Sequence, residues 1–162
     1  MSSAKYPPDG RRGAAFSIAH DDYRGGSIPE TIRSANEETL LIAQIETARG
    51  LENVEEIAAV PGIDALWIGL YDLTLSLNIP GQMNHPDVLA ATDRVFAACD
   101  AHNKSPAVLV TSIPEGQSQI QRAFKLIAYG GDLWVYQAVL RLGIASLSVE
   151  HNKSRPCRDR TP

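Results

Sequence analysis

The chain has 162 residues, of which 44% are hydrophobic and 21% are charged, and this composition is ordinary for one globular domain with its own core. The net charge of −4 argues against nucleic acid as the main partner, and no apolar run approaches the roughly 18 residues of a membrane span. Residues 1–8 lack the apolar core of a signal peptide and two cysteines do not make a disulfide framework, so we expect a cytoplasmic protein.

The N-terminal part of the chain begins as a loop and continues as a helix. Residues 1–26 are rich in proline and glycine, which is typical of loops. Ser27 followed by Glu30 has the spacing of a capping box, in which each residue satisfies a backbone N–H at a helix start. We therefore predict a helix that begins at Ser27 and ends near Asn36.

A buried strand is predicted over residues 39–46, and it ends in a carboxylate. Side chains on a strand alternate between two faces, so Ile42, Gln44 and Glu46 share one face. The residues between them are all apolar. One face of this strand should therefore pack against helices, while the other carries two polar groups at its carboxyl end.

The remaining elements alternate along the chain in the same way. Residues 70–84 are predicted to be a loop with one helical turn, and Ile120 and Phe124 are predicted to point inward from their helix. Further strands are expected over 63–69, 107–110 and 126–129. Further helices are expected over 51–59, from Pro86 to about Asn103, from Ser112 onward, and from Asp132 to about Ser146. Ser112 and Glu115 have the spacing of a second capping box at the start of their helix.

This alternation predicts an α/β fold of parallel (β/α) units, with about four strands and four to five helices. Parallel strands require right-handed crossovers, and four units make half of a TIM-type barrel, which as a whole needs about 250 residues. Residues 1–146 are expected to form this partial barrel as one domain. Residues 147–162 are basic and are expected to be a disordered tail.

Two carboxylates mark the carboxyl ends of adjacent strands. Glu46 ends the first strand, and Asp72 follows the second. Functional residues gather at this end of parallel strands, and Mg²⁺ or Mn²⁺ prefers oxygen ligands, so the pair predicts a divalent metal site. The structural alternative is that Asp72 caps a turn and Glu46 lies at an exposed strand end.

Five stretches of the chain belong together: residues 6–13, Ala43 to Thr47, Val60 to Asp64, Ile68 to Leu73 and Gly130 to Leu133. In combination they resemble the HpcH/HpaI aldolase and citrate lyase family. The resemblance covers roughly residues 5–140 and corresponds to the C-terminal half of the family's barrel. Members of the family include metal-dependent 2-keto-3-deoxy acid aldolases, 4-hydroxy-2-oxoheptanedioate aldolase and macrophomate synthase.

The resemblance implies a metal-dependent carbon–carbon lyase of the class II aldolase type. It would cleave a small 2-oxo acid to pyruvate or a related oxo acid through a metal-bound enolate, with the metal acting as a Lewis acid. Glu46 and Asp72 would bind Mg²⁺ or Mn²⁺, with Co²⁺ as a further candidate. Gln44 would lie beside the substrate as a catalytic and binding residue, and the backbone N–H groups of Leu70, Tyr71 and Asp72 would meet the substrate carboxylate.

The chain also departs from the family pattern. The family's catalytic base, a His with an acidic partner, and its enolate-stabilising Arg have no counterpart in a matching context, and Leu70 and Tyr71 replace the usual Pro-Asn or Pro-Gly. The four histidines, which are His20, His85, His102 and His151, are expected at the surface. A second hypothesis is therefore a non-catalytic, truncated member that keeps only the metal ligands.

A half-barrel should also need a partner. Four strands leave two unpaired edges and an apolar face that a closed barrel would cover. The residues expected on that face are Ile42, Leu66 or Trp67, Leu109 and Ile127. We therefore expect a homo-oligomer, or completion of the barrel by another half-barrel.

Overall fold

A computed structural model describes the backbone of residues 2–153 and the side chains of residues 2–148. None of the helices it describes is long and apolar enough to cross a membrane. The elements follow in the order η1 (Ala19–Asp21), α1 (Ile28–Glu38), β1 (Ile42–Ile45), α2 (Ala48–Glu52), α3 (Val54–Ala59), β2 (Ala65–Ile68), α4 (Leu70–Ser76), α5 (Pro86–Ala101), β3 (Ser105–Val110), α6 (Ile113–Gln121), β4 (Leu126–Tyr129) and α7 (Asp132–Lys153).

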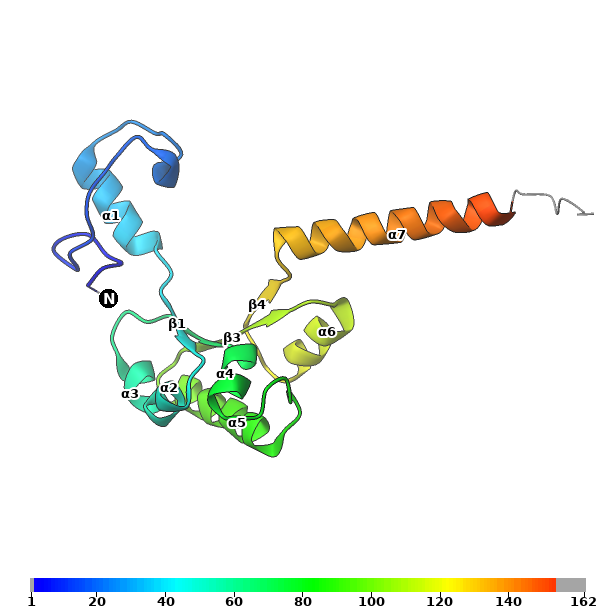
Figure 1. Ribbon diagram of the computed structural model, residues 1–162. Coiled ribbons are helices and arrows are strands. Elements are labelled where there is room, and N and C mark those ends of the chain that lie inside the picture. The colour runs from blue at the N-terminus through cyan, green and yellow to red at the C-terminus, as the bar shows by residue number, and fades with distance from the viewer. Residues whose placement is uncertain (1, 154–162) are drawn as a thin grey trace, which may run out of the picture.

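The four strands form one parallel sheet in the order β1-β2-β3-β4. The predicted strand order and direction are thus confirmed, and the sheet is the partial (β/α) barrel expected from the alternation of elements. Helix α5 packs against β2 and β3, and α3 packs against α5. Helices α1 and α7 project away from the sheet at its two ends (Figure 1).

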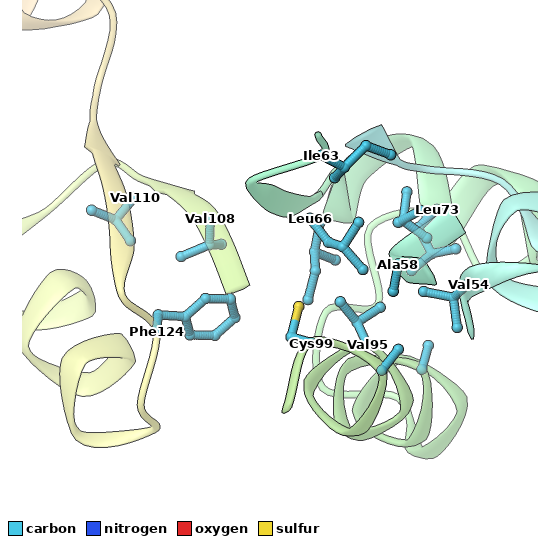
Figure 2. Packing of buried hydrophobic residues seen from close by; sticks show 14 residues of the cluster. Val54, Ala58, Ile63, Leu66, Leu73, Val95, Cys99, Val108, Val110 and Phe124 are labelled. Atoms are coloured by element: carbon cyan, nitrogen blue, oxygen red, sulfur yellow. The ribbon is translucent and has the colours of Figure 1, made fainter. Parts of the chain in front are cut away.

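The core lies between the sheet and the helices on one of its faces (Figure 2). Ile45, Ile68 and Val108 occupy neighbouring positions on the three strands and are all buried. Val54 from α3 and Val95 from α5 pack against them from the helix layer. The alternation predicted for the first strand is therefore confirmed: its apolar face is the face that the helices cover.

The opposite face of the sheet has no helix layer among the described residues. Ile42 is 38% exposed there, and Trp67 and Leu109 are only partly buried. Leu66 is fully buried on the helix side, so Trp67 is the open-face residue of that pair. The placement of Ile127 on the open face is wrong, because Ile127 pairs with Val108 and packs against the core.

Several predicted boundaries differ from the structure for local reasons. Ser27 begins α1 but its side chain makes no capping bond, so the first capping box is wrong. The helix predicted over 51–59 is split at Asn53, whose side chain donates to the Arg49 carbonyl and ends α2. The first half of the predicted 70–84 loop is α4, a helix of two turns where only one helical turn is predicted.

The C-terminal elements show a second set of differences. Ser112 caps α6 as predicted, because its side chain accepts from the N–H of Glu115. The Glu115 side chain accepts from the N–H of Thr111 instead of the N–H of Ser112 that a capping box requires. Ile120 is exposed and its inward placement is wrong, whereas Phe124 is buried just after the helix ends. Helix α7 continues to Lys153 rather than ending near Ser146, and residues 154–162 of the predicted tail lie outside the described residues.

An ion pair ties α3 to α5 at the surface. Arg94 Nη2 lies 2.7 Å from Glu55 Oε2, and the same nitrogen donates to the carbonyl of Glu52. The hydrogen bond from Arg94 lowers the pKa of Glu55 from 4.5 to about 2. The pair therefore makes the stability of the α3–α5 packing depend on pH.

We expect Glu55→Gln to lower the melting temperature above pH 4.5 and to lose this effect as the pH falls towards 2. The folded-state pKa is depressed, so the contribution is complete above the unfolded value and disappears as Glu55 is protonated. Both side chains are substantially exposed, so the effect is small. Thermal melts across this pH range check it, with Glu56→Gln as the control. A difference between wild type and Glu55→Gln that does not change with pH contradicts it.

Candidate metal and substrate site

The carboxyl ends of β1 and β2 are held together directly. Ile45 and Ile68 are the last paired residues, and the N–H of Gly69 donates to the Ile45 carbonyl at 3.0 Å. Glu46 follows Ile45 and therefore lies beside Gly69. The side-chain amide Nε2 of Gln44 donates to Glu46 Oε2, so Gln44 and Glu46 form a pair at this edge of the sheet.

Helix α4 starts at once after this junction and carries Asp72 in its first turn. Gly69 is the N-cap residue, and its carbonyl accepts from the N–H of Leu73 at 2.9 Å. Leu73 is fully buried and anchors the helix in the core. Asp72 itself is exposed, and no hydrogen bond or ion pair engages its carboxylate within the described part of the chain. Its oxygens are therefore free to accept a ligand.

A cavity of about 390 Å³ opens between the β2–α4 junction, the start of α5 and α6. Four of the five predicted site residues line it, namely Gln44, Leu70, Tyr71 and Asp72. Glu46 is not among the lining residues, although its carboxylate touches Gln44. The structure thus brings the predicted residues to one edge of the sheet, where Gln44 lines the cavity and contacts Glu46.

The opposite wall of the cavity contains polar residues that sequence reasoning missed. Thr111 follows β3, Glu115 and Gln119 come from α6, and Arg122 directly follows α6. Thr111 could have been found, because it stands at the carboxyl end of the third strand, where the same rule that selected Glu46 applies. Arg122 has no such signal, since it lies at the far end of α6.

No histidine lines this cavity among the described residues. His85 caps the start of α5, where its ring accepts from the N–H of Asp87, and His102 follows the end of that helix. His20 lines a second cavity of about 210 Å³ beside Tyr6 and Arg12. His151 lies outside the residues whose side chains are described.

The donor set at the sheet edge fits a hard cation. Among the described residues no group of three or more His, Cys, Asp or Glu side chains could hold a metal, so a cation here would rest on the two carboxylates. Mg²⁺ is commonly bound in this way, by one or two carboxylates with water or substrate in the remaining positions. Glu46 and Asp72 are therefore suitable candidate ligands.

A parallel sheet that gathers carboxylates and a cavity at the carboxyl ends of its strands has the arrangement of a (β/α) barrel enzyme. The family model of the HpcH/HpaI aldolase/citrate lyase family matches residues 3–138. The chain belongs to this family.

Individual relatives agree with this assignment. The chain is 33% identical over 138 residues to 5-keto-4-deoxy-D-glucarate aldolase from Salmonella paratyphi C. The aligned region covers 85% of this chain and 53% of the relative. The crystal structure of an HpcH/HpaI aldolase from Desulfitobacterium hafniense matches with a TM-score of 0.77 and 28% identity, over 99% of this chain and 60% of the other. Macrophomate synthase matches with a TM-score of 0.76 and 25% identity, over 96% of this chain and 55% of the macrophomate synthase chain. The chain spans about half the length of the curated relatives it matches.

Proposed function

We propose that this chain carries the metal-binding part of a carbon–carbon lyase of the class II aldolase type. The lyase would cleave a small 2-oxo acid to pyruvate or a related oxo acid, and this chain would supply its metal site. The observation that carries the proposal is the convergence of Gln44, Glu46 and Asp72 at two adjacent strand ends, beside a cavity large enough for such a substrate. Family membership and an aldolase relative support the reaction class.

Each site residue has a distinct role in this proposal. Glu46 and Asp72 would hold Mg²⁺ or Mn²⁺, with Co²⁺ as a further candidate, and Gln44 orients the Glu46 carboxylate by its hydrogen bond. When bound, a divalent cation supplies positive charge that favours negative charge on the substrate oxygen. Leu70, Tyr71 and Asp72 are first-turn residues of α4, so their N–H groups have no intrahelical acceptor and suit the substrate carboxylate.

A second candidate function is a metal-binding chain without aldolase activity of its own. The observation that favours it is the absence of a histidine from the described lining of the cavity. Aldol cleavage needs a base that removes the hydroxyl proton, and loss of a general base typically costs about 10²–10⁴-fold in rate. Decarboxylation of oxaloacetate needs no such proton transfer, so it would survive in this candidate.

We expect the purified chain with Mn²⁺ to decarboxylate oxaloacetate faster than free Mn²⁺ does, and to release pyruvate from 2-keto-3-deoxy acids very slowly. Both rates are followed by coupled detection of pyruvate. Glu46→Ala should remove the protein-dependent rate, whereas Asp93→Ala, which alters an exposed carboxylate on α5, should not. Rapid aldol cleavage that Glu46→Ala abolishes would rule out the second candidate. No protein-dependent rate with either substrate would rule out the first.

We also propose that the chain acts as a homo-oligomer or together with another half-barrel, in the cytoplasm as its composition suggests. The open face of the sheet supports this, because burying one large apolar side chain is worth about 1.5–3 kcal/mol. Helix α7 supports it too: Trp134 and Leu142 are exposed, as are the other apolar side chains on all sides of residues 132–148. Such surface favours association.

Light scattering after gel filtration should therefore give a mass above the 17.6 kDa of one chain. Replacing Trp134 and Leu142 together by Glu should lower that mass, because charged side chains on α7 oppose its burial. Gln137→Glu adds a charge to the same helix without removing an apolar group and serves as the control. A monodisperse species of 17.6 kDa that binds no hydrophobic dye would contradict association.

A further inference from the structure

Gly69 connects β2 to α4, and its backbone conformation does not require glycine. Its φ of −85° and ψ of 75° lie close to the inverse γ-turn, which residues with side chains adopt. Gly62 and Gly81 differ in this respect, because their φ values of 83° and 73° are left-handed. The reason for a glycine at position 69 must therefore be the space around it.

That space is already occupied by the side chains at the end of β1. A Cβ atom at position 69 would lie 2.8 Å from Glu46 Cβ, 3.1 Å from Gln44 Nε2 and 3.2 Å from Glu46 Oε2. The first distance is shorter than non-bonded carbon atoms tolerate, since their optimal separation is about 3.5–4.0 Å. Glu46 Cβ is attached to the backbone and cannot rotate away as the end of a long side chain can.

The ends of β1 and β2 also cannot move apart without losing a hydrogen bond. The N–H of Gly69 donates to the Ile45 carbonyl, and this bond fixes the distance between the two strand ends. A side chain at position 69 must therefore displace Glu46 and Gln44 or break the bond that joins β1 to β2.

We infer that Gly69 is a positioning residue: by lacking a side chain it lets the Gln44–Glu46 pair lie against the start of α4. Asp72 is three residues after Gly69, so its carboxylate is carried by the helix that begins where the Gln44–Glu46 pair lies. The part that concerns metal affinity rests on the proposed function, whereas the part that concerns the Gln44–Glu46 pair does not.

The first test follows the side-chain amide of Gln44 by NMR. In Gly69→Ala the Gln44 resonance should move to the position that it has in Glu46→Ala, because both changes remove the hydrogen bond between the two side chains. Gly116→Ala is the matched control, since a Cβ there would meet only Val110 Cγ2 at an ordinary 3.5 Å. A folded Gly69→Ala with the wild-type Gln44 resonance overturns the inference.

A second variant covers the case in which Gly69→Ala does not fold. Glu46→Gly removes the Cβ atom that the new methyl group would meet, so the double variant Gly69→Ala/Glu46→Gly should fold where Gly69→Ala alone does not. Failure of both variants to fold, while Glu46→Gly alone folds, overturns the steric explanation.

The metal is tested separately by Mn²⁺ titration with electron paramagnetic resonance detection. Gly69→Ala should weaken Mn²⁺ binding by about 10–100-fold, the typical effect of removing support from a metal ligand, while Gly116→Ala leaves it unchanged. Equal affinity in folded Gly69→Ala and wild type would overturn the metal part of the inference. A wild-type chain that binds no Mn²⁺ would refute the proposed function, and the Gln44 resonance would still decide the role of Gly69.

Discussion

Addition of Mn²⁺ or Mg²⁺ is expected to raise the melting temperature of the wild-type chain, and Glu46→Ala or Asp72→Ala is expected to remove that rise. A ligand that binds only the folded state stabilises it by about 2.7 kcal/mol at 100 times its Kd. For a chain of this size such a change in stability corresponds to a rise of roughly 5–10 °C. The two carboxylates are the candidate ligands because they lie at adjacent strand ends.

The experiment is a thermal melt at increasing metal concentration for wild type and both variants. Asp93→Ala provides the control, because Asp93 is an exposed carboxylate on α5 that does not line the cavity. Its rise should equal that of the wild-type chain. Equal rises in all four proteins would show that the metal acts through general surface charge and would contradict the assignment of Glu46 and Asp72.

The largest expected loss of stability comes from Leu73→Ala. Leu73 is fully buried in the core and is the residue through which α4 is anchored behind the site. Truncation of a buried leucine typically lowers the free energy of unfolding by about 2–5 kcal/mol, from lost transfer energy and the remaining cavity. Such a loss is a large part of the 5–15 kcal/mol that a typical domain has.

Leu75→Ala is the matched control for this prediction. Leu75 lies two residues further along α4 and is 59% exposed, so its truncation should change stability by no more than about 0.5 kcal/mol. Urea denaturation at one fixed protein concentration measures both variants. Because α4 carries Asp72, Leu73→Ala should also reduce the stabilisation by metal. Equal stability of the two variants would show that α4 is not held by Leu73.

Much of the fold could be predicted from local sequence patterns. The alternating apolar residues around Gln44 predicted the two faces of β1, and the succession of elements predicted four parallel strands. Both are confirmed, because period-two alternation and the need for crossovers between parallel strands are properties of short chain segments. Ser112 was also predicted correctly as a cap, since its bond reaches only to the N–H of Glu115.

The errors concern features that depend on neighbours distant in the sequence. The predicted positions of Ile127 and Ile120 are wrong. A short apolar run does not reveal its register with the neighbouring strand, so the face on which Ile127 lies could not be predicted. Nor does it reveal which side of a helix faces the core, so the exposure of Ile120 could not be predicted. Only one of the two turns of α4 is predicted, since Leu73 and Thr74 are buried by tertiary packing rather than marked by a strong helical period.

The same distinction between local pattern and tertiary contact applies to the candidate site. The carboxyl ends of parallel strands meet at one edge of a sheet, so the chain order alone placed Glu46 and Asp72 at the same edge. Gln44 and Glu46 share one face of β1 by its period-two alternation. Only the tertiary structure decided that this pair lies against Gly69, because that contact depends on the spacing between β1 and β2. It likewise decided that Arg122 reaches the cavity, since the packing of α6 beside β3 is a long-range event that no local pattern records.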